Sequence, residues 1–388
     1  MSNDQFAVFY VVNHAAFFVS HRLPLAKAVI ARGWQAKLFC GRGASEVMER
    51  EAVGRLSDTD LDTVKCQFSS AGLNPLKELL GAWKVFWSVW RERPEVIHTA
   101  SPKGNLIGGI VARFGRTKCL VVAVSGMGYL FTGESRGLKY IVKRIYLTVL
   151  RWIFRHPNLT VIVQNTDDSS LIQNEFRVSA NRIRLIPGSG VEIEKFQDIS
   201  YSTDSQTVIL PARIMKDKGV EEFVAAAASL KERGCSWHFE LVGAADYQSP
   251  NAINQDQLKE WVSTGAVTWR GHCEDMISVY ARSGIVCLPS YREGMPKSLL
   301  EAAAAGCPVV TSDAVGCKDA IIAGETGDLV PVRNVNELAD ALDALINDPQ
   351  RRSRYSESAR LLAQSKYDLK HVVRETINIY ENLLAKVV

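Results

Sequence analysis

The 388-residue sequence predicts an α/β protein with two doubly wound domains, each built around a parallel sheet. Short, continuously apolar runs alternate with helical patterns twice along the chain, and such runs are typical of parallel strands covered on both faces. The chain is also too long for one ordinary hydrophobic core, and a polar, unpatterned stretch at 198–205 interrupts it near the middle. We therefore expect domains at 1–195 and 206–367, followed by a final helix at 368–388.

The same alternation of elements is expected in both halves. In the first half, a helix is expected at Leu23–Arg32, with its apolar side chains on one face and Gly33 as its stop signal. The runs assigned to strands of the first half are Phe6–Val12, Gln35–Cys40, Glu95–Thr99, Leu120–Ser125, Thr160–Gln164 and Ile183–Ile186. The strands of the second half are expected at Thr207–Leu210, His238–Val242, Val267–Arg270, Ile285–Pro289, Val309–Thr311 and Asp328–Val330, and its helices at Glu221–Lys231, Pro296–Ala305 and Val335–Ile346.

Composition excludes several classes of protein. Hydrophobic residues make up 47% of the chain and charged residues 23%, which is typical of soluble globular proteins. The eight cysteines form no C-x-x-C pair, so we expect small buried side chains in a reducing compartment rather than disulfides or a zinc site. No basic secretory leader is present, and the apolar run Phe6–Val12 is too short to span a bilayer. The expected location is cytoplasmic.

Charge is distributed unevenly between the halves. Residues 1–195 contain 26 Lys and Arg against 16 Asp and Glu, a net charge of +10, whereas the remainder contains 20 against 26, a net charge of −6. A basic half indicates an anionic partner, which is a membrane surface, a phosphorylated acceptor or a nucleic acid, unless the difference is ordinary variation between domains. No nucleic-acid-binding motif accompanies the charge, so we expect no nucleic acid partner.

Two basic stretches of the first half are rich in aromatic residues. Trp83, Trp87 and Trp90 recur at helical spacing within Gly81–Arg93, and Arg136–Arg155 mixes Lys and Arg with Tyr, Trp and Phe. A helix of this kind either lies in an anionic lipid interface or packs its apolar face on the core while its charges stay in water. For the first stretch we expect core packing. For the second, both interpretations stay open.

The most specific pattern follows the expected strand Ile285–Pro289. A loop carries Glu293, and a helix begins with Pro296 at its first position and ends at Gly306. The N–H groups at the start of this helix face the carboxyl end of the sheet, where doubly wound folds bind ligands and where an anion is stabilised. Glu301, in the second turn, is placed to accept both hydroxyls of a ribose, and Glu293 to reach a sugar beyond the phosphates.

A second element favours the same ligand. The strand Thr207–Leu210 runs into a loop with Arg213 and Lys218, which can converge on a pyrophosphate. Two cations can neutralise a leaving diphosphate in place of a metal ion. No D-x-D follows a strand of the first half, so we predict no metal and no cofactor. The residues predicted to bind the donor are Gly190, Arg213, Lys218, Glu293, Gly294, Met295, Pro296, Lys297, Ser298, Leu299 and Glu301, of which Arg213, Lys218 and Glu293 are the predicted catalytic residues.

These motifs resemble those of retaining glycosyltransferases of family 4. Glu293 and Glu301 match the E-x7-E motif of that family, and Arg213 with Lys218 matches its R-x4-K pair. The runs Pro187–Val191 and Gly324–Val330 are similar as well. The resemblance implies the GT-B fold, in which two Rossmann-like domains face a central cleft and the final helix crosses back to the first domain. It also implies that the first domain binds the acceptor and the second binds a nucleotide sugar.

The first half resembles bacterial enzymes that build capsule, O-antigen or glycoprotein glycans on lipid carriers. The matching residues are Phe17–Pro24, His98–Lys103, Ser125–Tyr129 and Gln164–Asn165. The resemblance implies a UDP-sugar donor, an N-acetylhexosamine above all, and a lipid-diphosphate-linked glycan acceptor at the inner face of the plasma membrane. The residues expected to bind the acceptor are His21, Arg22, His98, Ser101, Lys103 and Tyr129. For His21 and His98, a purely structural role stays equally open.

The resemblance further implies a retaining, metal-independent transfer, in which the departing diphosphate accepts the acceptor's proton. The sequence departs from the family in two places. Asn13–Phe17 replaces the glycine-rich first loop of many members, and Ala100 stands where some members have a histidine. Two alternatives stay open: a UDP-sugar 2-epimerase on the same fold, and a non-catalytic subunit that binds nucleotide sugars.

Overall fold

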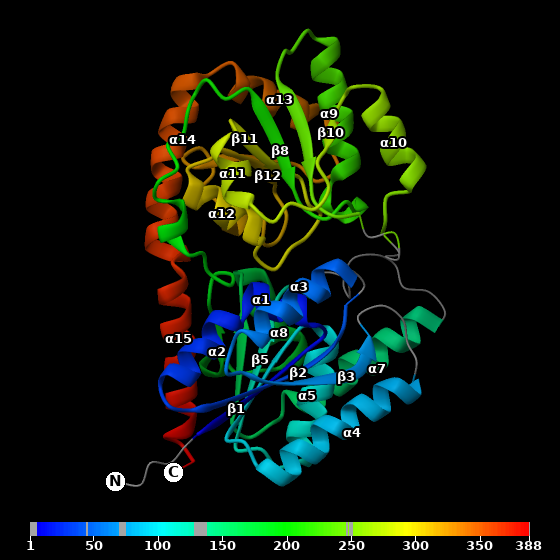
Figure 1. Cartoon of the computed structure of the whole chain (residues 1–388), viewed down its shortest axis with the longest axis vertical. Helices are drawn as coiled ribbons and strands as arrows, with labels where there is room; N and C mark the ends of the chain where they lie inside the picture. Colours follow the sequence, from blue (N-terminus) through cyan, green and yellow to red (C-terminus); the bar gives the residue numbers. More distant parts are fainter. Residues whose placement is uncertain are drawn as a thin grey trace. The chain divides into compact units, whose positions relative to one another are not determined.

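The computed structural model describes residues 6–43, 46–69, 75–127, 138–245, 247 and 251–387. The chain forms two compact units, one of Met1–Ile186 with Val372–Val388 and the other of Pro187–His371. The first unit ends before the position expected from the sequence, 195, because Ile186 packs in its core whereas Val191 already pairs with Asp368 of the second unit. Each unit contains one parallel sheet (Figure 1).

The first unit is built on a seven-stranded parallel sheet in the order β3-β2-β1-β4-β5-β6-β7. Its strands are β1 (Ala7–Val12), β2 (Gln35–Arg42), β3 (Asp62–Ser69), β4 (Val96–Ala100), β5 (Cys119–Val124), β6 (Leu159–Val163) and β7 (Ile183–Leu185). β1 pairs with β2 on one side and β4 on the other. The strand order therefore reverses between β1 and β4, which makes the carboxyl ends of these two strands a place where such folds bind ligands.

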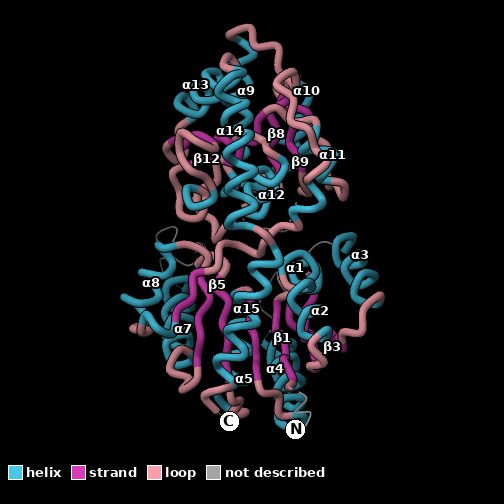
Figure 2. Tube along the Cα trace, turned by 90° about the vertical axis from the view of Figure 1, so that its left-hand side faces the viewer, coloured by secondary structure: helices cyan, strands magenta, loops and turns pink. Residues whose placement is uncertain are grey.

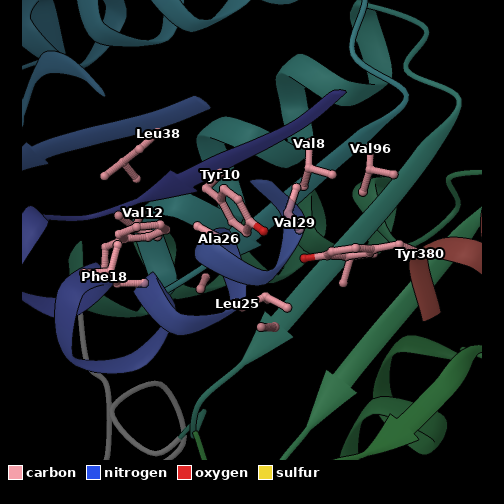
Figure 3. Packing of buried hydrophobic residues seen from close by; sticks show 14 of the residues in the cluster. Val8, Tyr10, Val12, Phe18, Leu25, Ala26, Val29, Leu38, Val96 and Tyr380 are labelled. Atoms are coloured by element: carbon pink, nitrogen blue, oxygen red, sulfur yellow. The ribbon is translucent and has the colours of Figure 1, made fainter. Parts of the chain in front are cut away.

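Helices cover both faces of this sheet. One face is covered by α1 (Ala15–His21), α2 (Leu23–Ala31), α3 (Glu46–Ser57) and the C-terminal helix α15 (Leu369–Leu384). The other is covered by α4 (Pro75–Glu92), α5 (Pro102–Phe114), α7 (Leu138–Ile153) and α8 (Thr166–Phe176). Figure 3 shows the core of the first face, where Tyr10 and Leu38 of the sheet lie among Phe18 and Tyr380 of the helices. From Val372 onward, the last helix is thus part of the first unit's core.

The second unit has a six-stranded parallel sheet in the order β10-β9-β8-β11-β12-β13. Figure 2 colours the strands of each unit magenta and the helices around them cyan. Its strands are β8 (Thr207–Pro211), β9 (His238–Val242), β10 (Thr268–Trp269), β11 (Ile285–Leu288), β12 (Val309–Ser312) and β13 (Gly327–Val330). Its helices are α9 (Val220–Glu232), α10 (Gln255–Ser263), α11 (Met276–Ala281), α12 (Lys297–Ala305), α13 (Val335–Ile346) and α14 (Pro349–Leu362). The strand order reverses between β8 and β11.

The fold class predicted from the sequence is confirmed, and the differences are local. The strand β3 was not predicted, because charged and polar residues alternate with its apolar ones at the edge of the sheet. Pro296 is the residue before α12 rather than its first residue. Six of the eight cysteines are buried as expected, but Cys235 and Cys273 are half-buried. Among the described residues, no helix has the length and apolar character needed to cross a membrane.

The expected core packing of the tryptophan stretch is wrong. Trp83, Trp87 and Trp90 of α4 are 61%, 51% and 55% exposed, whereas Val85 and Val89 face the sheet and are fully buried. The helix has two apolar stripes, and spacing alone does not say which one the core takes. The core takes the stripe of smaller side chains. Of the second basic stretch, Arg136 lies outside the described residues.

Candidate active site

Several of the predicted donor residues gather at the carboxyl edge of the second unit's sheet, where the strand order reverses. The chain leaves β8 through a loop and a 3₁₀ turn, Lys216–Lys218, before α9 begins. Gly219 ends this turn with φ of +70°, and a Cβ there would lie 2.2 Å from the carbonyl oxygen of Pro289 after β11. Only glycine permits this close approach, and the approach carries Lys218 over to the loop that follows β11.

Lys218 and Glu293 form an ion pair at this edge. The Lys218 Nζ lies 2.5 Å from Glu293 Oε1, and the two side chains are only 17% and 13% exposed. The Ser290 hydroxyl donates to the same carboxylate oxygen at 2.7 Å. Both bonds are made to Oε1, which holds the Glu293 carboxylate firmly, and no contact to Oε2 is seen among the described residues.

The backbone around Glu293 is fixed by a third loop, which follows β12. The Glu293 amide donates to the Val315 carbonyl at 2.8 Å. Gly316 has φ of +83°, and a Cβ on it would lie 2.4 Å from the Glu293 carbonyl oxygen. Three strand ends, those of β8, β11 and β12, therefore converge on Glu293.

The first turn of α12 lies directly beyond this loop. Pro296 precedes the helix without a side-chain cap, and its carbonyl accepts from the Leu299 amide at 2.9 Å. Glu301 lies one turn on, where it pairs with Lys297 at 3.5 Å. The buried Tyr280 hydroxyl donates to Glu301 Oε2 at 3.2 Å, which fixes the carboxylate on the helix. The site thus combines two carboxylates, a lysine and a helix N-terminus.

The other predicted donor residues are placed in different ways. Arg213 is exposed on the loop after β8. Gly190 has φ of +77°, and a Cβ on it would lie 2.7 Å from the Leu369 Cα, so packing accounts for this glycine and its role toward a donor stays a prediction. Leu299 is fully buried and its amide donates to the Pro296 carbonyl, and its contact with a donor stays a prediction. Met295 likewise has its side chain in the core, against Gly188.

Several residues of the site were missed by the sequence. Tyr280 is one of them, and Tyr291 is another, whose hydroxyl donates to Glu222 Oε1 at 2.7 Å while Arg333 lies 4.4 Å from its ring. Burial is the main reason that the pKa of Tyr291 is raised to about 12. Positive φ at Arg333, 62°, marks a constrained loop beside this pair. The position of Tyr291 directly after Ser290, in the loop that carries Glu293, was the sequence signal that could have identified it as a residue of the site.

In the first unit, the predicted acceptor residues Ser101 and Lys103 lie at the start of α5, and their observed partners are within the protein. The Ser101 hydroxyl donates to Asn13 Oδ1 at 2.8 Å, and the amides of Lys103 and Gly104 both donate to the same oxygen at 3.1 Å. The Asn13 side chain therefore caps α5. The Lys103 Nζ pairs with Glu78 at 2.7 Å. Asn13, which stands where many members of the family have a glycine-rich loop, thus stabilises the start of α5.

His98 and Arg22 are buried, which corrects their expected role in binding the acceptor. His98 is 1% exposed and its Nδ1 is hydrogen-bonded to the Tyr380 hydroxyl of α15 at 2.5 Å. Figure 3 shows the hydroxyl ends of Tyr10 and Tyr380 turned toward each other. Burial, followed by the charge of Arg22, holds the pKa of His98 well below its usual value. These side chains form a polar cluster inside the core, which favours a structural role for them.

The last two predicted acceptor residues are His21 and Tyr129. His21 is half-buried, with its ring stacked on Phe17 at 4.6 Å and its Nδ1 3.1 Å from the Phe17 carbonyl. Tyr129 lies outside the described residues. A small cavity of about 80 Å³ opens beside Ser101, between α5, the end of β5 and α7. Its walls are mostly apolar, and the buried Asn105 Oδ1 has no hydrogen-bond partner in the described part of the chain.

Comparison with known families agrees with this geometry. The pattern of the family described as "Glycosyl transferases group 1" matches residues 191–362, and that of the "Glycosyl transferase 4-like domain" matches residues 20–188. The chain is a glycosyltransferase of this group. Together the two matches cover nearly the whole enzyme, and the first of them contains the ion pair of Lys218 with Glu293 and the helix with Glu301.

Curated relatives of the glycosyltransferase include enzymes of bacterial surface glycans. One from Campylobacter jejuni, N,N'-diacetylbacillosaminyl-diphospho-undecaprenol alpha-1,3-N-acetylgalactosaminyltransferase, is 26% identical over 97% of this chain and 99% of its own length. An Escherichia coli UDP-Gal:alpha-D-GlcNAc-diphosphoundecaprenol alpha-1,3-galactosyltransferase is 23% identical over 76% and 78%. The Staphylococcus aureus capsular polysaccharide glycosyltransferase CapM is 25% identical over 80% and 81%.

Solved structures share the fold of the enzyme. The Anabaena protein HepE in complex with UDP superposes with a TM-score of 0.75 at 17% identity, covering 97% of this chain and all of the other. WaaG, a glycosyltransferase involved in lipopolysaccharide biosynthesis, superposes with a TM-score of 0.72 at 15% identity, covering 97% and 99%. These likenesses confirm the GT-B class of fold that the sequence predicted.

Proposed function

We propose that the enzyme transfers an N-acetylhexosamine from a UDP-sugar to a glycan carried on a lipid diphosphate, with retention of anomeric configuration. The observation that carries this proposal is the edge of the second sheet, where Lys218, Glu293 and the start of α12 converge and Glu301 is fixed by Tyr280. This arrangement suits a nucleotide diphosphate sugar along its whole length. The names of the Campylobacter and Escherichia relatives, whose acceptors are carried on undecaprenyl diphosphate, support the choice of acceptor.

Each part of the donor has a partner in this scheme. Glu301 accepts the two ribose hydroxyls, and the first turn of α12 faces the diphosphate. Lys218, together with the exposed Arg213 on the loop after β8, neutralises the charge that builds up on the departing group. Glu293 keeps Lys218 in place with Oε1 and accepts a sugar hydroxyl with Oε2. The acceptor is assigned to the first unit, at the carboxyl ends of β4 and β5.

The proposed reaction breaks the bond between the anomeric carbon and the oxygen of the β-phosphate. The acceptor oxygen forms the new bond on the same face, and its proton passes to the released phosphate oxygen. UDP leaves with that proton, so the transfer needs no protein base. The functions of the described residues are therefore to bind, to orient and to stabilise charge.

Thermal stabilisation by a panel of nucleotide sugars tests the donor, because a ligand that binds the folded state raises its melting temperature by mass action. UDP-N-acetylhexosamines should stabilise the enzyme more than GDP- or ADP-sugars. UDP release should then depend on added acceptor, whereas a 2-epimerase releases no UDP in net turnover and a non-catalytic subunit turns over neither substrate. Stabilisation by GDP-sugars alone would contradict the donor assignment.

The ribose assignment predicts a large effect of Glu301→Ala on nucleotide binding. Loss of hydrogen bonds to a charged group should weaken UDP binding by about 1.5–3 kcal/mol, which is roughly a 10- to 150-fold increase in Kd. Tyr280→Phe, which removes the hydroxyl at 3.2 Å from Glu301 Oε2, should weaken binding less. Titration calorimetry measures both. An unchanged Kd for Glu301→Ala removes this residue from the site.

Metal independence predicts that catalysis survives chelation. Turnover in excess EDTA should equal turnover without it, since Lys218 and Arg213 supply the positive charge that a divalent ion supplies elsewhere. The rate of UDP release, measured with and without EDTA, is the test. Loss of turnover that added magnesium or manganese restores would show instead that the enzyme uses a metal.

A lipid-linked acceptor also makes an anionic membrane surface an expected partner, at the inner face of the plasma membrane. The net charge of +10 over residues 1–195 supports this part of the proposal.

A further inference from the structure

The helix α4 carries an apolar face that the core does not cover. Leu76, Leu79 and Leu80 are 74%, 68% and 56% exposed, and the three tryptophans of the same stripe continue this face toward the end of the helix. The Trp83 and Trp87 rings lie 6.5 Å apart and those of Trp87 and Trp90 5.2 Å apart, in stacked pairs. We define the α4 apolar face as Leu76, Leu79, Leu80, Trp83, Trp87 and Trp90. A continuous apolar surface of this kind marks an interaction site.

The charges around the α4 apolar face are basic. Both carboxylates of the helix are engaged elsewhere, Glu78 with Lys103 at 2.7 Å and Glu92 with Lys37 at 2.6 Å. The other charged residues of the helix are all cationic: Lys77, Lys84 and Arg91. The partner of this face is therefore expected to be anionic as well as apolar.

A second helix repeats the pattern on the same side of the sheet. α4 and α7 both pack against α5, which lies on one face of the first unit (Figure 1). α7 contains no acidic residue, and its exposed apolar side chains, Tyr140, Ile141, Val142 and Ile145, are between 46% and 59% exposed. Phe114, at the end of α5, is 67% exposed. The outer surface of this helix layer thus combines apolar and cationic side chains across more than one helix.

We propose that the α4 apolar face inserts into the interface of an anionic membrane, with α7 alongside it. Tryptophan is enriched where its ring can lie at the level of lipid headgroups, and Lys and Arg around it attract anionic lipid. Pairing of this face with a second copy of the chain would bring two basic surfaces together, which like charges disfavour. A lipid surface satisfies both the tryptophans and the cations.

The functional use of membrane docking rests on one part of the proposed function, that the acceptor is lipid-linked. Docking would then bring the first unit to the surface that carries the lipid-embedded acceptor. Binding to lipid without any acceptor does not depend on that assumption. The two proposals can therefore fail separately.

The test uses the full chain and phosphatidylcholine vesicles with or without phosphatidylglycerol. Sedimentation should show binding only with the anionic lipid, weakening as salt is added because the attraction is screened within about 10 Å. The variant with Trp83→Ser, Trp87→Ser and Trp90→Ser should bind on the order of a hundredfold more weakly, since three large apolar side chains no longer leave water. All three are exposed, so circular dichroism and the melting temperature should be unchanged.

The matched control is Leu361→Ser, which removes an apolar side chain that is 66% exposed on α14 of the second unit. Vesicle binding by this variant should equal that of the native chain. Brominated lipids should quench the tryptophan fluorescence of the native chain and leave that of the triple variant largely unquenched. Transfer to a lipid-embedded acceptor should fall in the triple variant relative to transfer to a short soluble analogue.

Absence of binding to anionic vesicles at low salt overturns the proposal, whatever the activity of the enzyme. A native chain that is dimeric without lipid, and that the triple variant makes monomeric, also overturns it by assigning the face to a second copy. If the native chain binds vesicles but shows no transfer to any acceptor, the docking surface stands and the proposed reaction fails.

Discussion

Lys218→Ala should lower kcat by about 10²–10³, the effect of removing one preorganised group that stabilises charge in a transition state. The Lys218 ammonium lies at the carboxyl edge of the sheet, where the diphosphate is proposed to leave, and Glu293 holds it at 2.5 Å. Its loss removes positive charge and leaves the largely buried Glu293 carboxylate without its partner. Both effects oppose a departing diphosphate. Steady-state kinetics with a UDP-sugar and a soluble acceptor measure the change.

The matched control lies in the same turn. Lys216 is half-exposed and is 3.6 Å from Glu221, away from the pair of Lys218 with Glu293. Lys216→Ala changes the net charge by the same amount as Lys218→Ala and should leave kcat within about twofold, because surface ion pairs contribute little. A loss of activity in this control would mean that the general charge of the loop matters rather than the position of Lys218.

A double variant separates a catalytic role from a merely structural one. If Lys218 serves only to neutralise Glu293, then adding Lys218→Ala to Glu293→Gln should cost no further activity relative to Glu293→Gln alone, since no unpaired buried charge remains. If Lys218 stabilises the leaving diphosphate, the double variant should be clearly less active than Glu293→Gln alone. We expect the second result. Equal activity of the double variant and Glu293→Gln would remove Lys218 from the catalytic residues.

The sequence was informative where a function depends on local pattern. Glu293 and Glu301 are eight residues apart on one loop and helix, so the helix and the positions of both glutamates could be expected, whereas the ion pair of Lys218 with Glu293 was not predicted. The strands of both sheets were found because a strand covered on both faces is continuously apolar. β3 was missed because it is an edge strand with polar residues in alternation.

Contacts between distant segments were out of reach. Asn13 caps α5 from a position 90 residues earlier in the chain, and Tyr380 meets His98 across 282 residues. A histidine in a strand carries no sign of which partner will cover it, so the sequence left both a ligand site and a structural role open for His98. The exposure of Trp83 could not be expected for a related reason. The helix α4 has two apolar stripes, and its packing against β3 and α5 decides which of the two is buried.

The buried histidine makes the enzyme sensitive to mild acid. Because burial lowers the pKa of His98, its ring stays neutral in the folded state, whereas the unfolded chain takes up the proton below pH ~6.5. The unfolded state then binds more protons, so stability is greatest above this pH and falls as the pH is lowered toward the folded-state pKa. The slope reaches about 1.4 kcal/mol per pH unit for one such group. His156, whose pKa is also lowered mainly by burial, should add to this effect.

Urea unfolding between pH 7 and pH 5 measures this loss of stability. Carboxylates such as Glu240, whose pKa is lowered on folding by bonds to Arg270 and Arg282 in spite of burial, lose their contribution only below about pH 4.5, outside this range. His98→Gln keeps a polar group beside the Tyr380 hydroxyl but cannot be protonated, so the decline in stability between pH 7 and pH 5 should become clearly shallower. His156→Gln should remove the other part of the slope. An unchanged decline in His98→Gln would mean that the imidazole already carries its proton in the folded enzyme. Two features of the structure disfavour that protonation: the His98 ring is 1% exposed, and the positive charge of Arg22 acts on it.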